Sequence, residues 1–435
     1  MFFTKVEDAI NWIHGDMGLR RKGEKDGLNN MRALLRRLGD PQLSFKKLHV
    51  AGTNGKGSTC AYLESALRAC GYKTGLYTSP YLCRYNERIR VNNVSIPDEA
   101  ICRLASRVRE EVLALAGENI FSTTFEIGTA ICFLYFAEEK VDAAVIEVGL
   151  GGRFDPTNVI VPEVCAIAAI GLDHTGILGD TLAQIGMEKA GIIKPGVPCA
   201  LYPVEDEALP PILEAATRNG SELLQTRLIP VRVLSEHARG AEYEAVFPSF
   251  GRMRLKLGLI GHHQISNSRL AVAALALLKE RGWDLPAENV ERGIEATRWA
   301  GRLEWIGDRY LIDGAHNPQG ASSLASYARQ YFYGKKTVLV TGMMHDKQID
   351  ECARILAPVF REVVATRVDY PRAALTSELR EIYEREGCIC HEAADIPSAI
   401  ELASRLAGED GAVVIAGSLY VAGEARIILT GGEQL

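Results

Sequence analysis

The chain has 435 residues, of which 47% are hydrophobic and 24% are charged, and its formal net charge is -6. This length favours two domains with separate cores, and the composition is typical of a globular protein. The lack of a basic surplus argues against a nucleic-acid partner. No apolar run approaches the roughly 20 residues that span a bilayer, and the N-terminus lacks a signal-sequence pattern, so we expect a cytoplasmic protein without a membrane partner.

The ten cysteines are scattered singly through apolar segments, and no zinc-like CxxC pair occurs. Buried free thiols are the expected state. Residues 5–38 favour two helices joined by a glycine-containing turn, with the polar stretch Gly23–Met31 leading into the second. Pro41 ends that pattern before a strand.

The segment His49–Thr59, HVAGTNGKGST, predicts a strand ending at Ala51, a glycine-rich loop and a helix that begins near Ser58. Glycines allow tight turns and bring bare N–H groups to an anion, while a helix N-terminus and Lys56 add positive charge. The strict Walker A pattern is not met, because Val50 replaces its first glycine and Gly57 follows the lysine. We still expect nucleotide phosphates to bind this loop. The expected ATP contacts are Thr53, Asn54, Gly55, Lys56, Gly57 and Ser58.

After a helix from Ser58 to Cys70, the strand Thr74–Thr78 leads into the loop TSPYLCRYNERIRVN. This loop carries Ser79 and the arginines Arg84, Arg88 and Arg90. The three arginines are equally compatible with a solvated face and with bidentate binding of carboxylates.

After the helix Asp98–Ala116, the stretch Val141–Val148 is almost entirely β-branched or small and apolar, as in a strand buried on both faces of a parallel sheet. Glu147 near its end is a lone carboxylate that requires a cationic partner. Beside a phosphate loop, that partner is expected to be Mg²⁺. The Gly149–Asn158 loop that follows is glycine-rich and should be mobile or wrapped around a ligand.

A further buried strand is predicted at Val164–Leu172, followed by Asp173 and His174. In open α/β sheets, ligands bind beyond the C-terminal ends of the strands. Because Ser79, Glu147 and His174 each follow such a strand, we expect them to converge with the phosphate loop, with His174 contacting the metal.

The next helix, residues 181–194, ends with Glu188, Lys189 and Lys194. Residues 197–260 indicate strands and one helix near Leu209–Asn219. A strongly apolar helix then begins at GHHQISN, where Gln264 and Asn267 suit hydrogen bonds to a base or ribose.

A change of pattern after the helix Ala287–Thr297 places a domain boundary near residues 298–301. We therefore expect an α/β protein with an N-terminal P-loop-type parallel-sheet ATPase domain, residues 1–297, and a smaller Rossmann-like α/β domain, residues 298–435. The expected strands of the second domain are Tyr310–Ile312, Thr337–Val340, Glu362–Ala365 and Ala412–Ala416, and the expected helices are Gly320–Tyr331, Ile349–Leu356, Thr376–Arg385 and Pro397–Leu406.

Polar residues again follow the strands of the second domain. They occur in DGAHNPQG with Asp313, His316 and Asn317, in TGMMHDK with His345, Asp346 and Lys347, and in GSLYVAGE with Ser418 and Tyr420. Each could be an ordinary loop residue. Reactive side chains at the strand ends of two domains indicate a site in a cleft between them.

Taken in order, HVAGTNGKGST, TSPYL with NERI, TTFE, EVGLGGRFDPTN, LDHTGILGDTL, EKAGIIK, HHQISN, AGRLE, DGAHNP, DYPRAA and GSLY resemble the folylpolyglutamate synthase/dihydrofolate synthase family of the Mur ligase superfamily. The resemblance covers residues from about 10 to about 426. It implies an ATP-dependent ligase in which ATP phosphorylates the carboxylate of a folate or dihydropteroate and L-glutamate then displaces phosphate to form an amide.

The resemblance also implies roles for individual residues. Lys56, Lys189 and His316 are the expected catalytic residues, and Lys189 matches a lysine that the family carries as a carbamate. Ser58, Ser79, Glu147 and His174 would serve Mg²⁺. Asn267, Arg302 and Asp313 match nucleotide contacts, whereas Arg88, Asp155, His316, Ser418 and Tyr420 match the glutamate or folate site.

Two alternatives remain. A muramyl ligase shares the nucleotide and metal motifs, but it requires a UDP-sugar domain before the phosphate loop, where only about fifty residues stand here. A regulatory P-loop ATPase would need neither Lys189 nor the residues on the amino-acid side. Nothing in the sequence marks an oligomer surface, so a monomer is expected.

Overall fold

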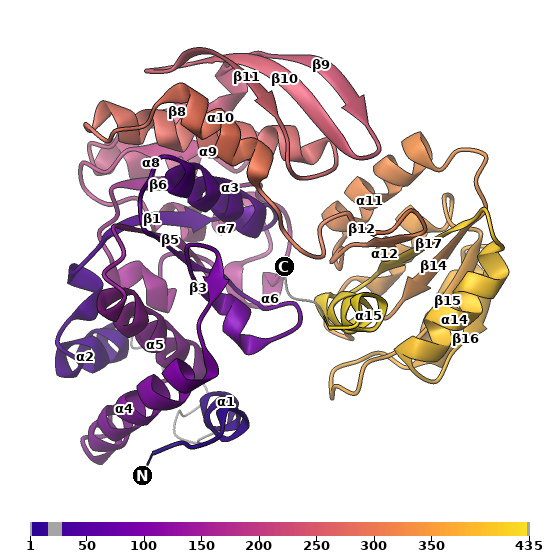
Figure 1. Cartoon of the computed structure of the whole chain (residues 1–435), viewed down its shortest axis with the longest axis horizontal. Coiled ribbons are helices and arrows are strands. Elements are labelled where there is room, and N and C mark those ends of the chain that lie inside the picture. The colour runs from indigo at the N-terminus through magenta and orange to yellow at the C-terminus, as the bar shows by residue number, and fades with distance from the viewer. Residues whose placement is uncertain (1, 16–27, 433–435) are drawn as a thin grey trace. The chain divides into compact units, whose positions relative to one another are not determined.

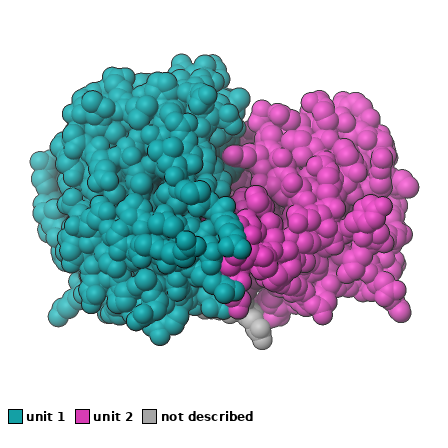
Figure 2. Space-filling view, turned by 90° about the horizontal axis from the view of Figure 1, so that it is seen from above, with its two compact units in different colours: residues 1–232, 244–255, 266–297 teal, residues 233–243, 256–265, 298–435 magenta. Residues whose placement is uncertain are grey.

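The computed structural model describes residues 2–15 and 28–432 and divides the chain into two compact units (Figure 2). Unit 1 comprises residues 1–232, 244–255 and 266–297, and unit 2 comprises residues 233–243, 256–265 and 298–435. Part of the predicted polar stretch before the second helix, residues 23–27, lies outside the described residues. None of the helices in the described part of the chain is long and apolar enough to cross a membrane.

Unit 1 is built on an eight-stranded sheet in the order β4-β3-β2-β5-β1-β6-β7-β8 (Figure 1). The strands from β2 to β8 in this order pair in parallel, while β3 and β4 extend the sheet antiparallel. Their bounds are β1 Lys46–Ala51, β2 Thr74–Tyr77, β3 Ile89–Val91, β4 Val94–Ser95, β5 Ala143–Glu147, β6 Val164–Ile167, β7 Cys199–Leu201 and β8 Leu223–Gln225.

Helices cover both faces of this sheet, which explains why β5 is buried along its whole length. One face carries α1 Val6–His14, α2 Asn29–Arg37, α4 Asp98–Gly117, α5 Thr124–Glu138, α7 Leu182–Ala190 and α8 Leu209–Arg218, whose apolar side chains form two core clusters with the strands. Against the other face, α3 Lys56–Ala69 packs on α10 Ala287–Ala296. The remaining helical segments are η1 Pro41–Leu43, η2 Tyr85–Arg88, η3 Pro156–Val159, α6 Thr175–Leu178, η4 Thr226–Leu228 and α9 His263–Glu280.

Unit 2 contains a six-stranded sheet in the order β12-β13-β17-β14-β15-β16, parallel except for β12. The strands are β12 Glu304–Ile306, β13 Tyr310–Ile312, β14 Thr337–Thr341, β15 Glu362–Ala365, β16 Ile389–Glu392 and β17 Ala412–Ala416; the helices are α11 Pro318–Tyr331, α12 Ile349–Leu356, α13 Thr376–Arg385, α14 Ile396–Ala407 and α15 Leu419–Thr430. A third sheet, β9 Val231–His237, β10 Gly240–Phe247 and β11 Gly251–Lys256, contains residues of both units.

The predicted fold class is confirmed, with a parallel-sheet N-terminal part and a C-terminal α/β part. The main errors concern the short elements at sheet edges and element ends. The strand expected to reach Leu172 ends at Ile167, and the stretch expected to be a loop after Thr78 contains η2 and β3. The sequence also gave no prediction of β12, β16 or α15.

Candidate active site

The phosphate loop connects β1 to α3. Gly52 and Gly55 have φ values of +155° and +82°, which favour glycine. The loop is fixed to the segment after β6, because the Thr53 N–H donates to the Ala169 carbonyl at 2.7 Å and the Thr53 hydroxyl bonds to Gly171. Lys56 Nζ donates to the carbonyl of Thr53 at 3.1 Å. The lysine therefore lies over its own loop, beside the backbone donors.

The helix begins at Lys56, two residues before the predicted start at Ser58. Gly55 in the left-handed region allows the chain to enter the helix directly from the loop. Consequently, Gly57 and Ser58 belong to the first helical turn, whose N–H groups have no partner within the helix. This arrangement is a suitable anion site.

Asn267 lies directly against this loop. A Cβ placed on Gly55 would lie 2.5 Å from Asn267 Oδ1, although the two residues are more than two hundred positions apart in the sequence. Asn267 is 3% exposed on α9. The structure thus brings this predicted nucleotide contact to the phosphate loop.

Glu147 ends β5 at the same edge of the sheet, since Val50 of β1 pairs in register with Glu147. Its carboxylate is 5% exposed, and Oε2 accepts the Ser79 N–H at 3.0 Å. Burial raises the pKa of the nearby Cys60 thiol, Glu147 raises it further, and Lys56 lowers it. The charges of Glu147 and Lys56 therefore both affect the Cys60 thiol, which indicates that the two side chains lie in the same part of the fold.

His174 follows β6 at a distance, as the N-cap of the short helix α6, with φ of +52°. Its backbone N–H donates to Asp173 Oδ1 at 2.9 Å, and its ring Nε2 lies 3.9 Å from the same oxygen. Within the described ranges 2–15 and 28–432, no group of three or more His, Cys, Asp and Glu side chains is arranged to hold a metal ion.

Lys189 lies in the last turn of α7 and is only 2% exposed. Burial, with a further contribution from the positive charge of Lys56, lowers the pKa of Lys189 to about 7, against the opposing effects of Asp173, Asp155 and Glu188. This amine is therefore substantially neutral near pH 7. In the sequence, Asp173 stands out only as the neighbour of His174, and nothing local indicates that its charge acts on a lysine.

Asp155 is buried in the loop after β5 and accepts N–H groups from Leu150 at 2.9 Å and from Thr157 at 3.0 Å. Burial raises the pKa of this carboxyl, and these hydrogen bonds oppose the rise. The loop is thus ordered around an internal carboxylate, and Asp155 is electrostatically coupled to Lys189.

The three arginines, which the sequence did not distinguish, have different contacts in the structure. Arg84 pairs with Asp98 at 3.3 Å, and Arg90 bonds to the Asn93 side chain and the Glu87 carbonyl. The Arg88 guanidinium instead lies over the rings of Tyr81 and Tyr85, 5.4 and 5.5 Å from their centroids. Among the described residues Arg88 makes no ion pair, and its Nε is buried without a hydrogen-bond partner.

In unit 2, the polar residues after β13 form a compact group. Asp313 accepts the N–H groups of Leu303 at 2.8 Å and Ala315 at 2.9 Å. Burial raises the pKa of Asp313, and the charge of Arg302 opposes this rise. His316 Nδ1 lies 2.8 Å from the Gly314 carbonyl. Because a carbonyl only accepts, Nδ1 carries a proton.

Strand β17 is the parallel neighbour of β13, so the GSLY segment follows at the same sheet edge. Ser418 caps α15 by accepting the Val421 N–H at 3.1 Å, and the Tyr420 ring stacks on Tyr370 with centroids 4.8 Å apart. Two other side chains singled out in the sequence have structural partners: Asp346 pairs with Arg372, and His345 lies 3.6 Å from Glu378.

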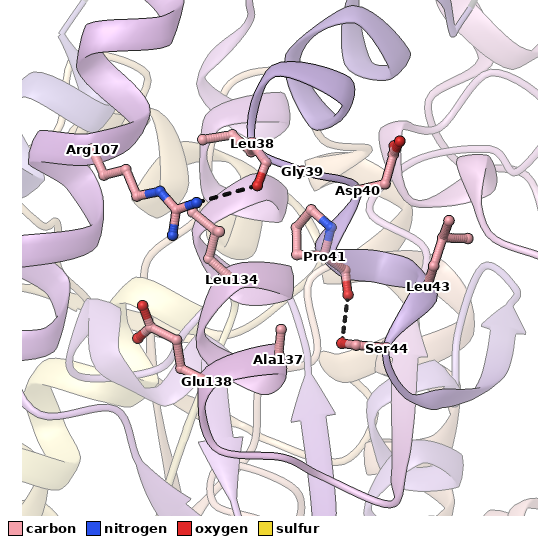
Figure 3. Close-up of a pocket in the computed structure, with 10 residues that line it drawn as sticks. All are labelled: Leu38, Gly39, Asp40, Pro41, Leu43, Ser44, Arg107, Leu134, Ala137 and Glu138. Atoms are coloured by element: carbon pink, nitrogen blue, oxygen red, sulfur yellow. Dashed lines mark hydrogen bonds between the residues drawn. The ribbon is translucent and has the colours of Figure 1, made fainter.

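A separate hollow of about 550 Å³ lies in unit 1 beside α2, η1, α4 and α5 (Figure 3). The Arg107 guanidinium there donates to the Leu38 carbonyl at 3.2 Å. Its lining contains none of the predicted site residues. The residues that line the hollow are Leu38, Gly39, Asp40, Pro41, Leu43, Ser44, Arg107, Leu134, Ala137 and Glu138. It is therefore distinct from the candidate active site.

Comparison with known proteins identifies the class first. Residues 50–275 match the Mur ligase middle domain, and residues 301–419 match the Mur ligase glutamate ligase domain. The chain therefore belongs to the class of proteins that combine these two Mur ligase domains.

The relatives then specify the family. The chain is 37% identical to the dihydrofolate synthase/folylpolyglutamate synthase of Bacillus subtilis, over 98% of this chain and 99% of that protein. Mycobacterium tuberculosis folylpolyglutamate synthase complexed with ADP superposes with a TM-score of 0.90 at 30% identity, covering 99% of each chain. E. coli FolC in complex with DHPP and ADP superposes with a TM-score of 0.86 at 28% identity, and the match covers 98% of each chain. The protein belongs to the folylpolyglutamate synthase/dihydrofolate synthase family.

Proposed function

We propose that this protein is an ATP-dependent ligase that joins L-glutamate to the carboxylate of a folate or dihydropteroate through an acyl phosphate. The observation that carries the proposal is the grouping of a phosphate loop, the buried carboxylate Glu147 and the buried amine Lys189 in a chain with full-length similarity to folate ligases. A muramyl ligase is less well supported, since the curated relatives compared above are folate ligases.

In the first step, a carboxylate oxygen of the folate attacks the γ-phosphorus, and ADP leaves. Two anions must approach each other, so the barrier depends on positive charge held at the phosphates. The N–H groups at the start of α3 and the Lys56 ammonium supply that charge, and Asn267, Arg302 and Asp313 bind the rest of the nucleotide.

The residues at the end of β5 suit Mg²⁺. Glu147 is a buried carboxylate at the edge of the sheet that carries the phosphate loop, and Ser58 and Ser79 supply oxygen ligands of the kind that magnesium prefers. His174 would add a nitrogen ligand. The chemistry supplied by a bound magnesium ion is neutralisation of phosphate charge.

Lys189 is proposed to react with CO₂ to form a carbamate. The neutral amine attacks the carbon of CO₂ to form an N–C bond, the nitrogen releases one proton, and the neutral amine becomes an anionic carbamate. A pKa of about 7 favours this reaction because much of the amine is unprotonated at neutral pH. The electrostatic effect of Asp155 and Asp173 then changes from attraction to repulsion, which a nearby cation would have to offset.

In the second step, the amino group of glutamate attacks the acyl carbon, phosphate leaves and one proton is released. Arg88, Ser418 and Tyr420 are proposed to bind the incoming glutamate or the folate, and Asp155 the folate. With Nδ1 directed at the Gly314 carbonyl, Nε2 is the ring nitrogen of neutral His316 that is suited to accept a proton from the amine. Keeping water away from the acyl phosphate is a requirement of this chemistry.

We further propose that residues 1–297 form the ATPase domain and residues 298–435 the glutamate-ligase domain, and that the enzyme acts as a cytoplasmic monomer on small molecules rather than nucleic acid.

Phosphate release tests the function. Purified protein with magnesium and ATP is supplied with L-glutamate alone, with dihydropteroate and L-glutamate, with tetrahydrofolate and L-glutamate, or with a UDP-muramoyl substrate and its amino acid. Release that requires a pteroyl substrate and glutamate is expected, and release with both pteroyl substrates identifies a bifunctional enzyme. Equal release in all four mixtures would identify an uncoupled ATPase and refute the ligase.

A further inference from the structure

His49 is a buried, titratable side chain to which the reaction above gives no role. It lies in β1, three residues before Gly52, and is fully buried. Its Nε2 is 2.9 Å from the Thr157 hydroxyl oxygen, across 108 residues of sequence. The Thr157 hydroxyl in turn bonds to Asp155 Oδ1. A continuous buried chain of hydrogen bonds therefore connects the phosphate-loop strand to the loop that follows β5.

The direction of these hydrogen bonds follows from the Asp155 end. Asp155 accepts two backbone N–H groups, from Leu150 and Thr157, as a carboxylate does. The single hydroxyl proton of Thr157 is then donated to Asp155, so its oxygen must accept from His49. His49 is consequently the tautomer with a proton on Nε2, and its Nδ1 is bare.

His49 stays neutral in this position. Burial, with a further contribution from the positive charge of Lys194, lowers its pKa to about 3. Lys194 is held nearby, where its Nζ donates to the Asn158 carbonyl at 3.2 Å. The direction of the hydrogen-bonded chain is thus the same throughout the physiological pH range.

Packing alone does not account for a histidine here. In the described part of the chain, the His49 Nδ1 is buried without a hydrogen-bond partner. An unsatisfied buried polar atom destabilises the folded state, which an apolar side chain of similar size would avoid. What such a side chain could not supply is the Nε2–H, which is directed at the Thr157 hydroxyl.

We propose that His49 is a positioning residue that acts through Thr157 to fix the orientation of the Asp155 carboxylate, and thereby sets the affinity for the pteroyl substrate. Without His49 the Thr157 hydroxyl would lose its buried donor, and the Asp155 carboxylate would be oriented mainly by the N–H groups of Leu150 and Thr157. The identity of the ligand rests on the proposed function, whereas the hydrogen-bonded chain does not.

The test compares Thr157→Val and His49→Phe, which break the chain, with Thr157→Ser and His49→Gln, which retain a hydroxyl and an N–H donor. Thr226→Val is the matched control, because Thr226 is a fully buried threonine of the same unit whose hydroxyl donates to the Leu201 carbonyl at 2.9 Å. For each protein we would measure urea unfolding, the KM for dihydropteroate and for tetrahydrofolate, and the Kd for ADP.

Breaking the chain should raise the pteroyl KM roughly tenfold or more, the range typical of losing a residue that orients a ligand-binding group. The ADP Kd should change less than about twofold, Thr157→Ser should restore the KM, and Thr226→Val should lose stability without a KM change. In the double variant, His49→Phe should add no further effect to Thr157→Val, because both act through one hydroxyl.

Additive effects in the double variant, or equal KM values for Thr157→Val and Thr226→Val, would overturn the positioning role while leaving the ligase intact. If the wild-type protein releases no phosphate with either pteroyl substrate, the proposed function fails instead, and with it the ligand assigned to Asp155. If Thr157→Val does not fold, the comparison of His49→Phe with His49→Gln decides the question, and equal pteroyl KM values for these two variants overturn the positioning role.

Discussion

The two glycines at the ends of α3 offer a direct test of how tightly the phosphate loop is built. Gly55 precedes the helix at φ +82°, and Gly71 follows it at φ +94°. Both conformations disfavour any residue with a Cβ. The difference is that nothing lies within 4 Å of a Cβ at Gly71, whereas a Cβ at Gly55 would lie 2.5 Å from Asn267 Oδ1 and 3.2 Å from Asn267 Cγ.

Gly71→Ala should therefore cost only the conformational penalty, about 1–2 kcal/mol, partly offset by about 0.4–1 kcal/mol from the reduced entropy of the unfolded chain. Gly55→Ala carries the same penalty and, in addition, a collision in a packed site, for which about 1–3 kcal/mol is typical. Since Asn267 is 3% exposed, it has little room to yield. We expect Gly55→Ala to lose roughly 2–4 kcal/mol in total and to bind ADP at least tenfold more weakly.

Urea unfolding and calorimetric titration with ADP would measure both effects. The double variant Gly55→Ala, Asn267→Ala removes the colliding amide, so its stability relative to Asn267→Ala alone should fall only by the Gly71→Ala amount. Equal stability losses for Gly55→Ala and Gly71→Ala, together with unchanged ADP affinity, would refute the contact between Asn267 and the loop.

Three further predictions concern charged side chains. Glu147→Gln should reduce phosphate release by two orders of magnitude or more (~10²-fold), and a smaller reduction that does not respond to magnesium concentration would contradict a metal role. In CO₂-free buffer, stability of the wild type relative to Lys189→Met should rise between about pH 7 and 9. The pKa of Lys189 is about 7 in the folded protein, whereas the ordinary value of 10.5 applies to the unfolded chain. Between these values the unfolded chain binds more protons than the folded protein, so stability increases with pH. A difference in urea midpoints that does not change with pH would show that the lysine is not desolvated. Arg88→Lys should raise the KM for L-glutamate or for folate roughly tenfold, because an ammonium cannot bind a carboxylate bidentately or stack on two rings; an unchanged KM for both would assign Arg88 to structure alone.

The sequence alone determined much of the architecture. Three strands of unit 2, β13, β15 and β17, and the helices α12 and α13 have the predicted bounds. The uninterrupted apolar run of β5 predicted burial on both faces. These elements were predictable because their patterns reflect burial within one short segment. The phosphate loop was predictable because its glycines and lysine are consecutive.

The short strands at the edges of the sheets were harder to predict from the sequence. Strand β3 contains Arg90, and β16 is partly exposed along its length, so neither has the apolar alternation of a half-buried strand. They are strands because a neighbour supplies hydrogen bonds: β2 pairs with β3, and β15 pairs with β16. That information lies in the partner strand rather than in the segment itself.

The tertiary structure decided which polar residues are available for chemistry. Arg84 and Arg88 look alike in the sequence, but only Arg84 has a carboxylate within reach, from Asp98. Lys189 looks like an ordinary residue near a helix C-terminus, yet α7 buries it beside Lys56 and lowers its pKa to about 7. Ionisation and pairing depend on desolvation and on charges brought together from distant positions, and these quantities exist only once the chain is folded.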